Sequence, residues 1–254
     1  MAVAGNTSVS TAKPPAGSLL RQVRRSLAPY FPQAVHNWRE ARFYGLYGEV
    51  ELHLLEFLCD RNRDAIDVGA NDGSYVHYMR RYARRVIAYE PMPSLAAALR
   101  RKFRHGVVIE PIALSDSKGT VPLCVPVVGG VAVSGCSTIS TEASATYPAL
   151  QSTSVPMDLL DSVYSGEVGF MKIDVEGHEQ AVLDGAVKTI GRCLPRMLVE
   201  VDERLSAGGL ARARAYFDRL GYRGYFVRQG RVEPADQFSI ERYQDPVNLP
   251  DLAA

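Results

Sequence analysis

The sequence predicts an α/β fold: a single domain built on a doubly wound, mainly parallel, Rossmann-like sheet. Segments with strand character alternate with segments of helical periodicity along most of the chain, as βαβ units require. The stretch from Asp64 to Glu90 is itself a complete strand–turn–helix–strand unit. Polar clusters follow nearly every predicted strand, at the edge where α/β sheets bind ligands.

The unit from Asp64 to Glu90 has the pattern of a nucleotide-binding βαβ motif. An apolar, β-branched run at 65–68 is followed by the turn Gly69–Gly73, and helical spacing of apolar residues comes next. A second strand at 85–89 ends on Glu90, about 17 residues after the turn and close to the roughly 20 expected for a ribose-binding acid. This stretch therefore predicts a ligand that carries a ribose.

The charge around the turn indicates which cofactor it binds. A dinucleotide site needs G-x-G-x-x-G and bare main-chain amides to hold a pyrophosphate. Here Asn71 stands where a second glycine belongs, and Asp67 and Asp72 bring negative charge. Carboxylates repel pyrophosphate but suit the ammonium and sulfonium of S-adenosylmethionine. The alternative is an ordinary α/β turn in which Asp72 caps the following helix.

Composition sets the class of protein. With 254 residues, 46% hydrophobic and 22% charged, the chain can form one large soluble domain. A net charge of +1 gives no global argument for nucleic acid. The cysteines lie far apart without metal-ligand spacing, so we expect core thiols in a reducing compartment and a cytoplasmic protein. No apolar run is long enough to span a membrane, and Met1–Ser18 lacks a signal-peptide core.

The chain divides into four predicted parts. These are a disordered tail at 1–18, an N-terminal helical segment at 19–60, the Rossmann-like domain at 61–237, and a C-terminal tail at 238–254. Leu19–Tyr30 is basic and amphipathic, which suits peripheral contact with an anionic membrane. Packing of this helix against the domain is the favoured alternative. Glu49 to Asp60 reads as a helix that leads into the first strand.

The part of the domain after Glu90 continues the alternation and then interrupts it. A helix is expected around Leu95–Phe103 with Ser94 as its N-cap, followed by a third strand at 107–114. Two prolines confine an added strand at 121–128 to a sheet edge. Gly129–Ser154 is rich in Gly, Ser and Thr, and reads either as a substrate-facing insertion loop or as a disordered excursion.

The remaining segments complete the predicted sheet. We expect a short helix at 157–163, a fourth parallel strand at 168–174, a helix at 179–190, a fifth strand at 197–201, a helix at 210–220 and a terminal strand pair within 222–231. Right-handed crossovers place the carboxyl ends of the parallel strands along one edge. The polar clusters gathered there are Asp67 with Gly69–Gly73, Glu90, Ser115–Asp116, Asp174–His178 and Glu200–Glu203.

Four stretches of the sequence resemble the FkbM-type S-adenosylmethionine-dependent methyltransferases. They are IDVGANDGSY (66–75), VIAYEPMPS (86–94), EPIALSDSKG (110–119) and MKIDVEGHEQAVLDGA (171–186), with a looser match at LVEVDE (198–203). The resemblance implies the class I methyltransferase type of sheet. It also implies methyl transfer to a hydroxyl, often of a sugar, a glycolipid or a natural product.

The resemblance also implies roles for individual residues. Lys172, Asp174, Glu176 and Gly177 match the second signature of the family, where methyl donor and acceptor meet. The residues expected to bind S-adenosylmethionine are Asp67, Gly69, Ala70, Asn71, Asp72, Gly73, Glu90, Pro91, Ser115, Asp116 and Asp174. An alcohol needs a base to become a good nucleophile. The catalytic candidates are His178, Asp174 and Glu176, with Glu200 as a further possible base.

The predicted function is an S-adenosylmethionine-dependent O-methyltransferase (EC 2.1.1). Its acceptor would be a small molecule or a glycan, such as a sugar, a glycolipid or polysaccharide, or a natural product. We expect no nucleic-acid partner, no integral membrane segment and no metal, although Asp174, Glu176, Glu200 and Asp202 leave a divalent ion open. The oligomeric state is also open. The alternatives are a nicotinamide-dependent oxidoreductase and a catalytically silent protein that binds the cofactor or a partner.

Overall fold

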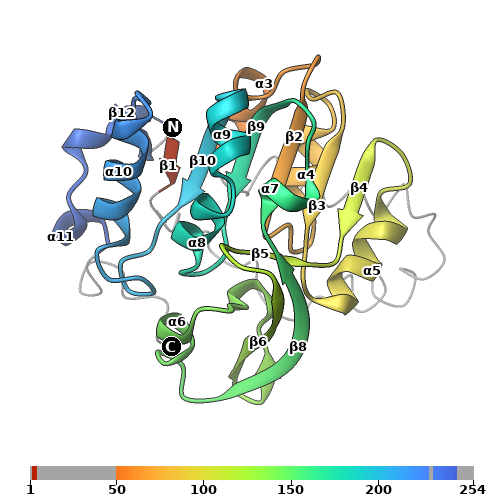
Figure 1. The fold of residues 1–254 in the computed structure, drawn as a ribbon. Helices are drawn as coiled ribbons and strands as arrows, with labels where there is room; N and C mark the ends of the chain where they lie inside the picture. The colour runs from red at the N-terminus through yellow and green to blue at the C-terminus, as the bar shows by residue number, and fades with distance from the viewer. Residues whose placement is uncertain (1, 5–49, 229–230, 245–254) are drawn as a thin grey trace, which may run out of the picture.

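The computed structural model of the chain describes residues 2–4, 50–228 and 231–244, and the described part contains two sheets (Figure 1). The main sheet has eight strands in the order β12-β11-β1-β10-β9-β2-β3-β4. Its strands run parallel except β12, which pairs antiparallel with β11. Along the chain they are β1 (Ala2–Ala4), β2 (Asp64–Val68), β3 (Val86–Tyr89), β4 (Val107–Glu110), β9 (Val168–Ile173), β10 (Arg196–Glu200), β11 (Tyr225–Arg228) and β12 (Arg231–Pro234).

Helices cover both faces of the main sheet, which confirms the doubly wound fold. The strands alternate their side chains between two cores, so that Ala65 and Phe170 face one and Ile66 and Met171 face the other. The first core includes residues of α3 (Leu55–Leu58), α4 (Ser74–Met79) and α5 (Pro93–Lys102). The second includes residues of α7 (Leu160–Val163), α8 (Glu179–Asp184), α9 (Val187–Cys193) and α10 (Gly209–Arg219).

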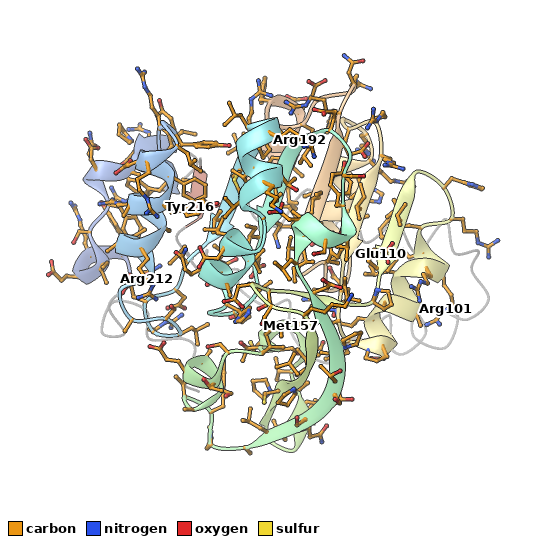
Figure 2. All side chains as sticks on the ribbon, viewed as in Figure 1. Arg101, Glu110, Met157, Arg192, Arg212 and Tyr216 are labelled. Atoms are coloured by element: carbon orange, nitrogen blue, oxygen red, sulfur yellow. The ribbon has the colours of Figure 1, made fainter. Side chains whose placement is uncertain are left out.

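The second sheet forms an arm beside the carboxyl ends of the parallel strands (Figure 1). Its strand order is β5-β8-β6-β7, and the long antiparallel pair of β6 and β8 makes most of it. Figure 2 shows Met157 of β8 where this arm joins the main sheet. The elements of the arm are β5 (Ala113–Leu114), β6 (Gly119–Val128), β7 (Val131–Ala132), the short helices η3 (Ser134–Cys136) and α6 (Thr141–Ser144), and β8 (Leu150–Asp158).

The arm is where the element predictions fail most. Residues 129–154 are not a structureless loop, because they contain β7, η3, α6 and the first half of β8. The helix expected at 157–163 is wrong at its start, since β8 continues to Asp158 and α7 begins at Leu160. The third predicted strand divides between the two sheets, as β4 and β5.

The prolines of β6 do not confine it to an edge, because β8 pairs with it on one side and β7 on the other. Cys124 donates its N–H to the carbonyl of Thr138, on the side away from β8. Pro122 and Pro126 are spaced evenly from Cys124, so their missing N–H groups face that same side. The ladder to β8 therefore loses no donor.

Two helices differ from prediction for local reasons. The N-cap of α5 is Met92 rather than Ser94, and Pro93 takes the first helical position, where its fixed φ fits and no N–H is needed. The helix expected at 179–190 is two helices that break at Gly185. A Cβ on Gly185 would collide with the main chain of Ser115, so the break lets α8 and the 115 segment approach closely.

The N-terminal and C-terminal predictions are only partly covered by the described residues. Leu19–Tyr30 lies outside them, and so does most of the predicted tail at 1–18, of which Ala2–Ala4 is strand β1. The helix expected at 49–60 is a 3-10 helix, η2 (Val50–Leu54), followed by α3. The chain after β12 continues through η4 (Ala235–Gln237) and α11 (Ile240–Tyr243). Among the described helices, none combines the length and apolar character needed to cross a bilayer.

Candidate active site

A cavity lies at the carboxyl ends of β2, β3 and β9, where the arm meets the main sheet. It is walled by the turns after these strands, by the segment around β5, and by the arm. Its lining residues are Val68, Gly69, Asn71, Tyr89, Glu90, Pro91, Ile112, Ala113, Leu114, Leu123, Ser134, Gly135, Ser137, Ile139, Asp174, Val175, Glu176 and His178. The predicted polar edge of the sheet is therefore a real concave site.

The glycines of the first turn allow neighbouring chain segments to pack closely against it. Gly69 and Gly73 both have φ of +80°, which residues with a Cβ rarely adopt. A Cβ on Gly69 would collide with the carbonyl of Asp174, and one on Gly73 would lie 2.6 Å from Leu99 and from Phe103 of α5. These glycines thus let β2 meet the loop after β9 and let α4 meet α5.

Glu90 lies where the sequence places it, at the end of β3 and against the cavity. Only 5% of it is exposed. Its Oε2 accepts the main-chain N–H of Asn71 and its Oε1 accepts that of Met92, both at 2.8 Å. Burial raises the pKa of this carboxyl, and the two main-chain donors oppose that effect. The carboxylate is thereby fixed in orientation by the turns on both sides of the cavity.

Asp72 and the predicted adenine residues do not line the cavity. Asp72 Oδ1 accepts a hydrogen bond from the N–H of Ser74 at 3.0 Å, but the N-cap of α4 is Gly73, so Asp72 lies one residue before the capping position that the alternative gave it. Ser115 is buried behind the wall, and Asp116 is exposed to solvent. The residues of this segment that do line the cavity are the apolar Ile112–Leu114, just before them.

Asp67 and Lys172 form a buried pair behind the cavity wall. They are register partners on the neighbouring strands β2 and β9. Asp67 is fully buried, and burial raises the pKa of its carboxyl to about 7. Nζ of Lys172 lies 3.9 Å from Asp67 Oδ1 and donates to Asp174 Oδ2 at 2.8 Å. Asp174 is the member of this group that reaches the cavity.

Glu176 occupies a strained position in the loop after β9. Its φ of +53° is left-handed, a conformation that costs a non-glycine residue about 1–2 kcal/mol. The hydroxyl of Thr138, which is 1% exposed, donates to the main-chain oxygen of Glu176 at 2.7 Å. Glu179 Oε1 accepts the N–H of Gly177 at 2.9 Å. The arm and α8 therefore hold this loop in place together.

The electrostatics of the loop favour protonated carboxyls. Burial, and then repulsion from Asp174, Glu179 and Asp202, raises the pKa of Glu176 to about 8. Burial raises the pKa of Glu179 to about 7. A carboxyl that titrates near neutral pH can take up a proton during a reaction, which an ordinary glutamate does poorly.

His178 lines the cavity on the side of the Ile112–Leu114 segment. Its Nε2 lies 2.9 Å from Oγ of Ser115, whose hydroxyl donates to Asp116 Oδ1 at 3.2 Å. The tautomer of the ring decides whether Nε2 of His178 donates to this hydroxyl or accepts from it. Burial lowers the pKa of the ring, so it is uncharged at neutral pH.

The predicted site residues thus fall into two groups. Those at the cavity are Gly69, Asn71, Glu90, Pro91, Asp174, Glu176 and His178; those described away from its lining are Asp67, Ala70, Asp72, Gly73, Ser115 and Asp116. The sequence prediction named no individual residue of the arm, although Ser134, Gly135, Ser137 and Ile139 line the cavity and belong to the segment read as a possible substrate-facing insertion. Within the described ranges, no three His, Cys, Asp or Glu side chains are placed to hold a metal ion.

A comparison with protein families decides what kind of protein carries this site. The methyltransferase FkbM domain matches residues 67–223, more than half of the chain. The chain belongs to the FkbM methyltransferase family. The resemblance noted in the sequence is therefore confirmed. No curated protein matches it.

Several solved structures are similar to this member of the FkbM family. A methyltransferase FkbM from Methylobacillus flagellatus is 15% identical, with a TM-score of 0.49 over 83% of this chain and 56% of the other. An rRNA methylase from Streptococcus thermophilus is 8% identical, with a TM-score of 0.33 over 70% and 68%. The 23S rRNA methyltransferase ErmE is 18% identical, with a TM-score of 0.23 over 25% and 32%. The chain thus spans little more than half the length of the first of these structures.

Proposed function

We propose that this protein is an S-adenosylmethionine-dependent O-methyltransferase (EC 2.1.1) of the cytoplasm. Its acceptor would be a hydroxyl of a sugar, a glycolipid or polysaccharide, or a natural product. The observation that carries the proposal is the charge of the cavity. The acidic side chains among its described lining residues are Glu90, Asp174 and Glu176, and no Lys or Arg is among these residues. Such a lining repels a pyrophosphate and attracts an ammonium and a sulfonium.

The lining also fits the parts of the cofactor. Glu90 would accept hydrogen bonds from the ribose hydroxyls, and Asp174 would pair with the ammonium. The apolar segment Ile112–Leu114 offers a surface for adenine, in place of Ser115 and Asp116. When bound, S-adenosylmethionine supplies a methyl group already activated by positive sulfur. The protein must then align the acceptor oxygen and remove its proton.

Glu176 is the base that the geometry supports best. It lines the cavity, its backbone is held by Thr138, and its pKa of about 8 makes it more basic than an ordinary carboxylate. Burial lowers the pKa of His178, and its Nε2 is engaged by Ser115. We therefore assign proton removal to Glu176 and the placement of ligand against the Ile112–Leu114 wall to His178.

Calorimetric titration with S-adenosylmethionine tests the proposal, with NAD as the control ligand. We expect micromolar binding of S-adenosylmethionine and no binding of NAD. The variant Glu90→Ala should weaken binding at least about tenfold, or roughly 1.4 kcal/mol. Glu56→Gln removes a carboxylate from an exposed position on α3 and should bind like the wild type. Binding of NAD alone would instead indicate an oxidoreductase.

A screen of acceptors completes the test. Purified protein with methyl-labelled S-adenosylmethionine would be offered monosaccharides, glycolipids and polysaccharides that carry free hydroxyls, together with amine analogues of the same compounds. Label in the hydroxyl compounds alone would support O-methylation. Label in the amines alone would reject it while leaving methyl transfer intact. Cofactor binding without any transfer would favour the catalytically silent alternative.

A further inference from the structure

Lys172 carries a positive charge into a buried layer of the main sheet, where Asp67 lies beside it among apolar side chains. It is 4% exposed, on β9 between β2 and β10. Its register partners are Asp67 and Leu198, and the layer below it holds Ala65 and Phe170. An ammonium in such surroundings is costly unless other groups compensate its charge.

Three groups surround the ammonium of Lys172. It donates to Asp174 Oδ2 at 2.8 Å, lies 3.9 Å from Asp67 Oδ1, and sits 4.6 Å from the ring centre of Tyr75 on α4. Burial lowers the pKa of Lys172, but Asp174 and then Asp67 raise it above its usual range. The ammonium is therefore charged, and its one close hydrogen bond in this group points toward the cavity side, to Asp174.

Asp67 lies behind the ammonium rather than in the cavity. Both of its carboxylate oxygens are buried and accept no hydrogen bond from the described residues. It is absent from the described cavity lining, although it stands in the sequence where the family motif begins. Its structural relation to the site passes through Lys172, which lies between it and Asp174.

We propose that Lys172 is a positioning residue that fixes the Asp174 carboxylate as an oriented anion at the cavity wall, with Asp67 as its counter-charge. This rests on the proposed function, because the fixed anion is what would hold the ammonium of S-adenosylmethionine. Lys172 itself touches neither donor nor acceptor. The acidic signature residues Asp67 and Asp174 then act through one buried cation.

A purely structural role predicts something different. Buried ion pairs contribute little stability compared with apolar side chains of similar volume, and their removal as a pair is often neutral or stabilising. Removal of Lys172 alone leaves Asp67 buried without a cation and should destabilise the fold. Removal of both charges should restore stability. If Lys172 serves the site, cofactor affinity should stay low even when stability returns.

The test therefore compares Lys172→Met, Asp67→Asn and the double variant with the wild type. Calorimetry with S-adenosylmethionine measures affinity, and urea unfolding measures stability. We expect Lys172→Met to lose stability and at least about tenfold in affinity. Asp67→Asn, which keeps the bond between Lys172 and Asp174, should bind within about threefold of wild type. The double variant should regain stability but keep the tenfold loss.

A second pair of variants tests the route through Asp174. Asp174→Asn should lose as much affinity as the double variant, and adding Lys172→Met to it should cause no further loss. Wild-type affinity in the folded double variant would overturn the inference while leaving the proposed function in place. Failure of the wild type itself to bind S-adenosylmethionine would overturn both. If Lys172→Met does not fold, the double variant alone decides the question.

Discussion

Glu176→Gln is the most informative single change, because it separates stability from chemistry. The wild-type carboxyl has an ordinary pKa of 4.5 when unfolded and about 8 in the folded protein. Glutamine keeps the size of the side chain but cannot ionise. The left-handed backbone and the hydrogen bond from Thr138 involve only main-chain atoms of residue 176, so the substitution leaves both in place.

The magnitude follows from linkage between protonation and folding. Each pKa unit corresponds to about 1.4 kcal/mol, so the difference corresponds to at most about 5 kcal/mol. The folded state binds the proton more tightly. The stabilisation is therefore complete below pH 4.5 and is lost as the pH rises through about 8. Above that, the ionised Glu176 repels Asp174, Glu179 and Asp202, whereas glutamine does not.

Urea unfolding at pH 5 and pH 9 measures this effect. As the pH rises from 5 to 9, the wild type should lose on the order of 1–5 kcal/mol of unfolding free energy that Glu176→Gln does not lose. Turnover should fall by about 10²–10⁴-fold, the usual contribution of a general base. Glu56→Gln, on the exposed side of α3, is the matched control and should change neither. If the stability of Glu176→Gln changed with pH as much as that of the wild type, the reasoning would be refuted.

Four further predictions address the rest of the site. Glu90→Gln replaces one accepting oxygen by an NH₂ group, which cannot accept a hydrogen bond from its main-chain N–H partner. The variant should lose about 1–3 kcal/mol of unfolding free energy in urea and should bind the cofactor more weakly in calorimetry. His178→Ala should weaken cofactor binding, measured by calorimetry, more than it lowers the turnover of the saturated enzyme, and unchanged affinity would remove it from the adenine wall. Gly69→Ala, with its Cβ against the Asp174 carbonyl, should lose more than about 2 kcal/mol or fail to fold, as thermal unfolding would show. Binding of S-adenosylmethionine at pH 7 should release a proton, mostly from Glu176, which titration in buffers of different ionisation enthalpy detects.

The parts of the fold that local sequence determines could be predicted well. The unit from β2 to β3 follows from three local features of residues 64–90. They are a β-branched run, a turn whose glycines need positive φ, and the helical spacing of apolar residues. Because the strands are parallel, their carboxyl ends lie along one edge of the sheet. For the same reason Glu90, Asp174, Glu176 and His178 could be placed near one another without any knowledge of contacts.

The arm could not be predicted because its structure depends on pairing between distant segments. β8 is mostly exposed along Leu150–Ser154 and carries no apolar alternation there, so its strand character comes from the ladder to β6. Thr138 shows the same limitation. Its importance comes from a hydrogen bond to a residue 38 positions away. Nothing in its local sequence distinguishes it from the neighbouring serines and threonines.

Some residues of the recognisable motifs lie away from the cavity lining. Asp67 and Lys172 are charged residues within apolar strands. This pattern indicates a buried ion pair as readily as it indicates a ligand-binding residue. Asp72 accepts a hydrogen bond from the first residue of α4, and Ser115 contacts His178 from behind the cavity wall. A motif read from sequence marks the region of a site, whereas only the direction of each side chain shows whether it faces the ligand.

Charge links binding to proton removal in this cavity. Burial and repulsion from Asp174, Glu179 and Asp202 raise the pKa of Glu176. A cation bound beside these carboxylates opposes that repulsion and lowers the pKa, because it favours the ionised form. Glu176 would then lose its proton when the methyl donor binds and be ready to accept one from the acceptor hydroxyl. The carboxylates that select a cationic cofactor would thus also make the formation of the base depend on its presence.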